Sequence, residues 1–148
     1  MNKILQLLPP PVIALLLILM AAFLSSTVSL TLLHAAQGGT AWLVTGLALT
    51  ISTILQLRTL KTTLLPNGTP TQLVTFGAYL WTRNPIYLGL LTSLVGLALF
   101  KGTLPYWLVP PAFFTIMNRF HIPAEEARLK DVFGADYLRY QQKVNRWI

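Results

Sequence analysis

The amino-acid sequence predicts an all-α integral membrane protein with about four transmembrane helices, a helical hairpin and an amphipathic helical C-terminal tail. Of its 148 residues, 54% are hydrophobic and only 10% are charged, whereas soluble domains carry about 25% charged residues. Two long runs contain no charge, and every acidic residue falls in one short window near the C-terminus. We therefore expect one membrane domain, residues 1–148, that ends in a distinct cytoplasmic tail at 118–148.

The first two apolar runs are predicted transmembrane helices. Residues 12–33 and 40–57 contain no charge, and roughly 20 residues of α-helix cross about 30 Å of hydrocarbon. The first run exceeds the apolar core of about 7 to 15 residues in a secretory signal, so we expect it to be retained. The Gln37-Gly38-Gly39 link is too short for a domain, which makes the two helices antiparallel neighbours.

The third and fourth membrane segments are shorter. Residues 86–100 and 104–117 would each reach only about 22 Å as α-helix, so they either thin the bilayer or form a partly sunken hairpin. A turn at 101–103 returns the chain to the side from which it entered. Pro110 and Pro111 are expected to kink the fourth segment, because proline removes a backbone donor.

Basic residues fall on one side of this predicted bundle. Lys3 precedes the first helix, and Arg58, Lys61 and Arg83 lie between the second and third, whereas Lys101 lies on the opposite side. By the positive-inside rule both termini are cytoplasmic, and we expect the protein in a prokaryotic cytoplasmic membrane. Topology and anionic lipids thus explain the net charge of +7, and no nucleic-acid partner is expected.

The inventory of metal and redox ligands is small. The chain contains no cysteine and only two histidines, His34 and His121. Disulfides, thiolate catalysis and iron–sulfur clusters are thereby excluded. Zinc and di-iron sites need several converging histidine or carboxylate ligands, so no metal is expected.

Two separated polar motifs are predicted to face the same compartment. Arg-Asn-Pro-Ile-Tyr at 83–87 opens the third segment, and Glu125-Glu126 follows the fourth. We expect the glutamates in the first turn of a helix from about Pro123 to Phe133, where they complement the helix dipole. A helical hairpin separates the motifs and brings both to one side, which predicts a catalytic site at the membrane surface.

Beyond that short tail helix, Gly134 is predicted to be its cap. Aromatic and apolar residues then recur at helical spacing. They are Phe133, Tyr137, Tyr140, Val144 and Trp147. We expect this stripe to pack the tail against the headgroups or the bundle, with Trp147 as an interfacial anchor.

The presence of each charged residue in the motifs can be explained by a structural role or by a functional role. Glu126 is expected to pair with Lys130 on the helix surface, for a few tenths of a kcal/mol. Glu125, for which Arg128 is an ordinary partner, is the better candidate for a ligand contact. Arg83 either snorkels to the interface or faces an anion, because a charge in mid-membrane costs roughly 2.5 to 3.5 kcal/mol.

A longer pattern runs from Thr71 to the C-terminus. It comprises Leu-Val-Thr-Phe-Gly-Ala-Tyr at 73–79, Arg-Asn-Pro-Ile-Tyr-Leu-Gly at 83–89, Asn-Arg-Phe at 118–120, and then Glu125, Glu126, Leu129, Phe133, Gly134, Tyr137, Tyr140 and Val144. In order and spacing it resembles the isoprenylcysteine carboxyl methyltransferase and phospholipid methyltransferase superfamily. The resemblance implies a short prokaryotic-type member that uses S-adenosylmethionine to methylate a lipophilic acceptor, whether a lipid, a prenylated molecule or a small hydrophobic metabolite.

The resemblance also implies which residues form the site. Those carried over to the methyl donor are Leu73, Val74, Tyr79, Asn84, Pro85, Ile86, Tyr87 and Glu125. The charged and aromatic groups of the donor and their place in the motifs add Arg83, Glu126 and Tyr140 as further candidates for donor binding. Arg119, His121 and Glu125 are the catalytic candidates, with His121 as a base for an acceptor that must lose a proton. Eukaryotic members have an arginine that engages prenylcysteine where this chain has His121, so their protein substrate does not carry over directly.

Two alternatives to the methyltransferase remain open at this point. A membrane reductase of the sterol-reductase type has a similar helical design but uses NADPH and transfers hydride. A non-catalytic membrane scaffold would tolerate alanine at Arg83, Asn84 and Glu125 without loss of any ligand.

Overall fold

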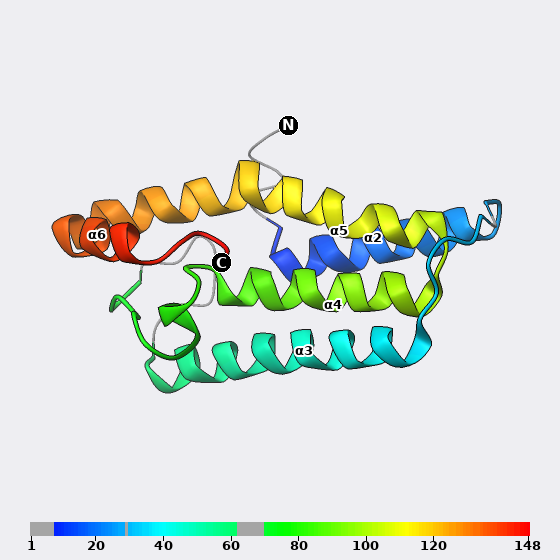
Figure 1. Ribbon diagram of the computed structural model, residues 1–148. Coiled ribbons are helices and arrows are strands. Elements are labelled where there is room, and N and C mark those ends of the chain that lie inside the picture. The colour runs from blue at the N-terminus through cyan, green and yellow to red at the C-terminus, as the bar shows by residue number, and fades with distance from the viewer. Residues whose placement is uncertain (1–7, 29, 62–69) are drawn as a thin grey trace.

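The computed structural model describes residues 8–28, 30–61 and 70–148, and its regular elements there are helices (Figure 1). Lys3 lies outside the described residues. The elements in chain order are α2 (Pro10–Ser25), α3 (Ala36–Thr59), the 3₁₀-helix η1 (Gly77–Leu80), α4 (Pro85–Lys101), α5 (Leu104–Ile116), the π-helix η2 (Met117–His121) and α6 (Ile122–Lys143). The all-α prediction is confirmed.

Helix α4 is the centre of the bundle, with α3 on one side and α2 and α5 on the other (Figure 1). The α3–α4 contact is close because glycines face each other across it. A Cβ atom on Gly46 would lie 2.4 Å from the Gly89 carbonyl oxygen, and one on Gly96 would lie 2.3 Å from the Leu43 backbone nitrogen. The two helices are therefore antiparallel, and the start of α4 lies beside the end of α3.

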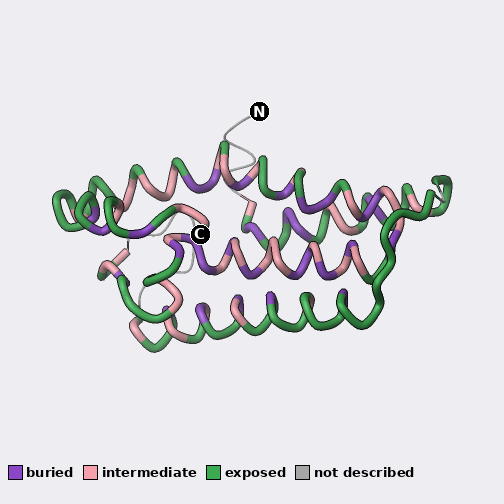
Figure 2. Tube along the Cα trace, in the orientation of Figure 1, coloured by how far each residue is buried: buried purple, intermediate pink, exposed green. Residues whose placement is uncertain are grey.

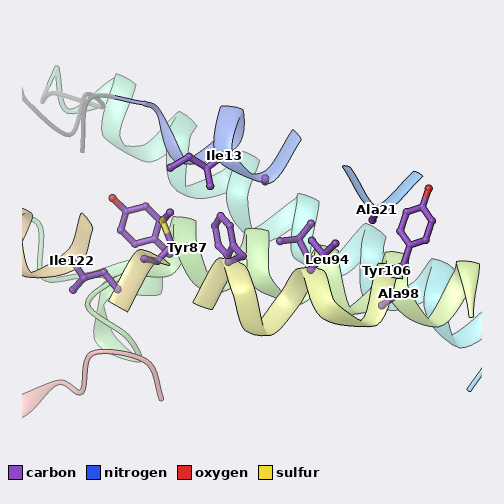
Figure 3. Close-up of a cluster of buried hydrophobic side chains, with 11 residues drawn as sticks. Ile13, Ala21, Tyr87, Leu94, Ala98, Tyr106 and Ile122 are labelled. Carbon is purple, nitrogen blue, oxygen red and sulfur yellow. The ribbon is translucent and has the colours of Figure 1, made fainter. Parts of the chain in front are cut away.

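The main core lies between α2, α4 and α5 (Figure 3). It includes Ile13 from α2, Ala98 from α4, and Phe113 from α5, and it continues through Met117 to Ile122 at the start of α6. The last four of these are fully buried. This continuous core fixes the direction in which α6 leaves the bundle.

Helix α3 is the one described helix that is both long and apolar enough to cross a membrane; α2 and α4 are shorter apolar helices. Figure 2 shows α3 exposed along most of its outer surface, where Trp42, Val44 and Ile51 are each more than half exposed. Such a continuous apolar surface is typical of contact with lipid. The prediction of about four transmembrane helices is thus supported by length for α3 alone.

The first predicted span was too long. Helix α2 ends at Ser25, not at residue 33. The hydroxyls of Ser26 and Thr27 donate to the carbonyls of Phe23 and Leu24 at 2.6 and 3.0 Å. These side-chain bonds to carbonyls of the last turn lie at the point where the helix ends.

The predicted turn between the third and fourth segments is present at the end of α4. Gly102 adopts φ +70° and caps the helix, a left-handed conformation that favours glycine. The α2–α3 connection is bonded to this turn. The Leu32 amide donates to the Gly102 carbonyl at 2.6 Å, and the Leu104 amide donates to the Leu30 carbonyl at 2.9 Å.

Helices α5 and α6 form one long rod through η2 (Figure 1). Helix α5 runs through Pro110 and Pro111, which cannot donate backbone hydrogen bonds, and the change to π-helix comes later, in η2. The predicted break at Gly134 is confirmed, because this residue has φ +51° inside α6. A second helical stretch follows it and turns the aromatic stripe back toward the bundle.

Candidate functional site

A cavity of about 280 Å³ lies where the starts of α4 and α6 meet the end of α3. Its volume is near the lower end of the roughly 300 to 1,000 Å³ typical of small-molecule sites. Residues before and inside α4 form one wall, and α6 forms the facing wall. The residues around the start of α2, Pro9 to Pro11, also line the cavity.

All residues predicted to bind the donor line this one cavity. They are Leu73, Val74, Tyr79, Arg83, Asn84, Pro85, Ile86, Tyr87, Glu125, Glu126 and Tyr140. The hairpin thus brings the two motifs together, as the sequence predicted. Arg119 and His121 are not among the lining residues: Arg119 is exposed on η2, and His121 is buried there.

A direct hydrogen bond joins the two motifs. The Tyr87 hydroxyl donates to Oε2 of Glu125 at 2.9 Å. Asn84 has non-helical dihedral angles, because proline disfavours the α conformation in the residue before it, and Pro85 takes the first helical position. This start aims Tyr87, in the first turn of α4, at Glu125, in the first turn of α6.

Glu126 pairs with two arginines. Its Oε1 lies 2.8 Å from Arg83 Nη2, and its Oε2 lies 2.6 Å from Arg146 Nη2. The predicted surface pair with Lys130 was wrong, because the two carboxylate oxygens of Glu126 bind these arginines. Arg83 was predicted to snorkel or to face an anion, and the anion that it faces is Glu126. The pair lies inside the protein, because the side chains of Arg83 and Glu126 are only 10% and 12% exposed.

The segment 144–147, which follows α6, is hydrogen-bonded to the first motif and to the residue before it. The Arg83 amide donates to the Asn145 carbonyl at 2.9 Å. The Arg146 carbonyl accepts from Thr82 Oγ1 at 3.0 Å and from Asn84 Nδ2 at 2.8 Å. Arg146 was missed by the sequence analysis, because it follows the end of the helix and so has no place in the periodic pattern.

Trp147 packs on the bundle. This is one of the two placements expected for the tail, the other being contact with the lipid headgroups. Its ring centroid lies 4.9 Å from that of Phe114, and its Nε1 donates to Asn118 Oδ1 at 3.4 Å. The same Asn118 oxygen accepts from Arg146 Nη1 at 3.1 Å. The last residues of the chain are therefore held on both η2 and the first motif.

Burial raises the pKa of Glu125 above its ordinary value of 4.5; the hydrogen bond from Tyr87 and the charge of Arg128 oppose this shift, and Glu126 adds to it. Burial likewise raises the pKa of Tyr140, to about 12. Burial, together with the charge of Glu125, also raises the pKa of Tyr79. At neutral pH these tyrosines are therefore neutral hydrogen-bond donors, and the Glu125 carboxyl group binds a proton more readily than an exposed glutamate does.

Aromatic residues from α6 form the remaining wall. Tyr137 and Tyr140 pack with ring centroids 6.3 Å apart, and the Tyr140 hydroxyl donates to the Tyr79 carbonyl at 2.7 Å. Leu73 and Leu129 pack against the same cluster. Within the described ranges, no group of three or more His, Cys, Asp or Glu side chains is placed to hold a metal ion.

Comparison with known proteins adds independent information. The profile of the family described as phospholipid methyltransferase matches residues 34–136. An uncharacterized protein of Haemophilus influenzae is 41% identical over 63 residues, which are 43% of this chain and 100% of that protein. No solved structure matches the chain.

Proposed function

We propose that this chain, which belongs to the phospholipid methyltransferase family, is a membrane enzyme that transfers a methyl group from S-adenosylmethionine to a membrane-associated acceptor. The family implies both this donor and a lipid acceptor. The observation that carries the proposal for this chain is the single cavity lined by both motifs. The Tyr87–Glu125 hydrogen bond across it further supports a shared site.

The lining of the cavity fits the chemical groups of this donor. A sulfonium, an ammonium and ribose hydroxyls all favour a carboxylate, which Glu125 provides. An adenine ring and a sulfonium both favour aromatic faces, which Tyr79 and Tyr140 provide. Arg58 and Arg128 also line the cavity and add positive charge for an anionic group.

S-adenosylmethionine, when bound, supplies an electrophilic methyl group carried on sulfur. The residues of this chain then have three tasks: to bind, to orient and to exclude water. Tyr87 fixes the orientation of the Glu125 carboxyl group by its hydrogen bond. The packed tyrosines of α6 keep water from that wall, and fixed placement of two reactants lowers the entropic part of the barrier. No covalent nucleophile is needed.

The acceptor is proposed to reach the cavity from the bilayer. Ile54 and Leu57 of α3 and Pro11 of α2 line its rim, and α2 and α3 expose large apolar side chains over their outer surfaces. Apart from Arg58 at the end of α3, these lining residues are apolar, whereas α6 and the residues before α4 carry the other charged groups of the cavity. A lipid headgroup lying at this level would therefore meet the polar wall while its chains stay in hydrocarbon.

Calorimetric titration of the detergent-purified protein with S-adenosylhomocysteine tests the proposal. We expect saturable binding, weakened in Glu125→Gln by about 1.5 to 3 kcal/mol, the scale of a lost hydrogen bond to a charged group. Asp131→Asn is the matched control, because it removes one charge from an exposed position on the same helix. Binding of NADPH alone, or of neither compound by folded protein, would contradict the proposal.

A further inference from the structure

Two buried hydrogen-bond donors on the wall of the cavity have no partner among the described residues. They are the Tyr137 hydroxyl and Nε of Arg83, and both residues line the cavity. Tyr137 is only 1% exposed. Because an unsatisfied buried donor is destabilising, its presence in a site calls for a ligand group that completes it.

The Tyr137 hydroxyl lies in the charged part of the cavity. Burial raises its pKa, the charge of Glu126 raises it further, Arg83 lowers it, and Glu125 again raises it. The hydroxyl is therefore within the electrostatic range of all three charged groups and stays protonated at neutral pH. Its neighbour Tyr140 differs, because the Tyr140 hydroxyl already donates to the Tyr79 carbonyl.

Arg83, whose charge acts on the Tyr137 hydroxyl, is held rigidly. Its Nη2 donates to Glu126 at 2.8 Å and its Nη1 donates to the Gln141 carbonyl at 3.0 Å. These two bonds fix the plane of the guanidinium group, so its Nε–H has a set direction. A rigid N–H and a phenolic O–H that line the same cavity suit a ligand group with two acceptor oxygens.

We propose that Tyr137 is a further donor-binding residue, whose hydroxyl acts together with Arg83 Nε to bind the carboxylate at the amino-acid end of S-adenosylmethionine. The inference rests on the proposed function. It leaves Glu125 for the cationic or ribose part of the donor, since a carboxylate would repel a second carboxylate. It also assigns Glu126 the task of holding Arg83, without contact to the ligand.

A two-by-two comparison of protein and ligand tests this assignment. Wild type and Tyr137→Phe are titrated with S-adenosylhomocysteine and with 5′-methylthioadenosine, which lacks the amino-acid end. We expect the variant to bind S-adenosylhomocysteine about tenfold more weakly and methylthioadenosine as tightly as wild type does. Its thermal transition without ligand should not fall, because the lost hydroxyl makes no hydrogen bond within the described residues.

Tyr106→Phe is the matched control. Tyr106 is also buried but lies at the start of α5, at the other end of the bundle, and it should leave both affinities unchanged. If Tyr137→Phe weakened both ligands equally, or neither, the carboxylate assignment would be wrong. If wild type bound neither ligand, the proposed function itself would fail. Should the variant not fold, equal binding of S-adenosylhomocysteine and its methyl ester by wild type would overturn the inference.

Discussion

Arg146 and Glu126 form a bidentate ion pair: Nη2 of Arg146 lies 2.6 Å from Oε2 of Glu126, and its Nε lies 3.1 Å from Oε1. Glu126 also binds Arg83 of the first motif. One carboxylate therefore connects three segments: the loop before α4, the start of α6 and the end of the chain. Because the Arg146 carbonyl binds Thr82 and Asn84 as well, the C-terminal segment holds the cavity wall in place.

Loss of this pair should destabilise the protein measurably. In Arg146→Ala, Glu126 keeps only Arg83, and Asn118 loses a donor. We expect the free energy of unfolding to fall by about 1 to 3 kcal/mol, since a partly buried charged hydrogen bond is left unmade. Thermal unfolding in detergent measures this, and Arg146→Lys should recover only part of it, because lysine lacks the bidentate geometry.

Arg139→Ala is the control for that experiment. Arg139 pairs with Asp136, but these side chains are 74% and 66% exposed, and exposed ion pairs contribute little. Its unfolding temperature should stay close to that of wild type. Equal shifts in the unfolding temperature of the two variants would show that the Arg146–Glu126 pair stabilises the protein no more than an exposed ion pair does.

Glu125 should make stability depend on pH. Its pKa in the folded protein is raised above the ordinary value of 4.5, so the folded state binds its proton more tightly than the unfolded state does. The free energy of unfolding therefore rises as pH falls through the raised pKa, and the gain is complete below about 4.5. Wild type should thus gain stability relative to Glu125→Gln between neutral pH and about pH 4.5.

Denaturation of both proteins at a series of pH values measures this difference. Tyr87→Phe sharpens the test, because the Tyr87 hydrogen bond holds the pKa of Glu125 down. In that variant the gain should begin at higher pH. A difference between wild type and Glu125→Gln that stays constant with pH would mean that Glu125 is not perturbed by burial.

The helical hairpin and the composition of the cavity were predictable because their signals are local. Pro85 marks the start of α4, and Gly102 marks its end with a left-handed cap. Once the hairpin is recognised, the two motifs must lie at the same end of the bundle. For that reason the predicted residues from 73 to 87 and from 125 to 140 line one cavity.

The contacts that the sequence did not predict are between distant segments. Lys130 was the natural partner of Glu126 by helix spacing, but Arg146 reaches it because the chain reverses direction within α6. That reversal depends on the positive φ of Gly134 and on the packing of Tyr137. Neither the direction of the second helical stretch nor the contacts made beyond it follow from periodicity. Helical spacing alone therefore predicted Lys130 as the partner in place of Arg146.

The glycine contact between α3 and α4 should be intolerant of a methyl group. A Cβ atom at position 46 would lie 2.4 Å from the Gly89 carbonyl oxygen and 2.4 Å from the Ser93 nitrogen. Both are backbone atoms that move only if the helices separate. We expect Gly46→Ala to lower the free energy of unfolding by about 1 to 3 kcal/mol, measured by thermal unfolding in detergent.

Gly38→Ala on the same helix is the comparison, because its added Cβ would meet only Ala35 Cβ, at 3.9 Å. Alanine is the better helix former by about 1 kcal/mol, so this variant should be as stable as wild type or more stable. If Gly46→Ala behaved in the same way, the close α3–α4 contact would be wrong.

Membrane orientation can be tested with single cysteines, since the chain has none of its own. Gln142 and Lys101 are both exposed. Gln142 lies near the cavity, and Lys101 lies at the end of α4 that is far from the cavity. With cytoplasmic termini, a membrane-impermeant maleimide added to intact cells should label Lys101→Cys and should reach Gln142→Cys only after permeabilisation. Both substitutions are compatible with the expected orientation. Gln142→Cys changes no charge, and Lys101→Cys removes a positive charge from the predicted outer side, in agreement with the positive-inside rule. The reverse labelling pattern would place the cavity on the outer side, away from the cytoplasmic supply of the methyl donor, and would contradict the proposed orientation.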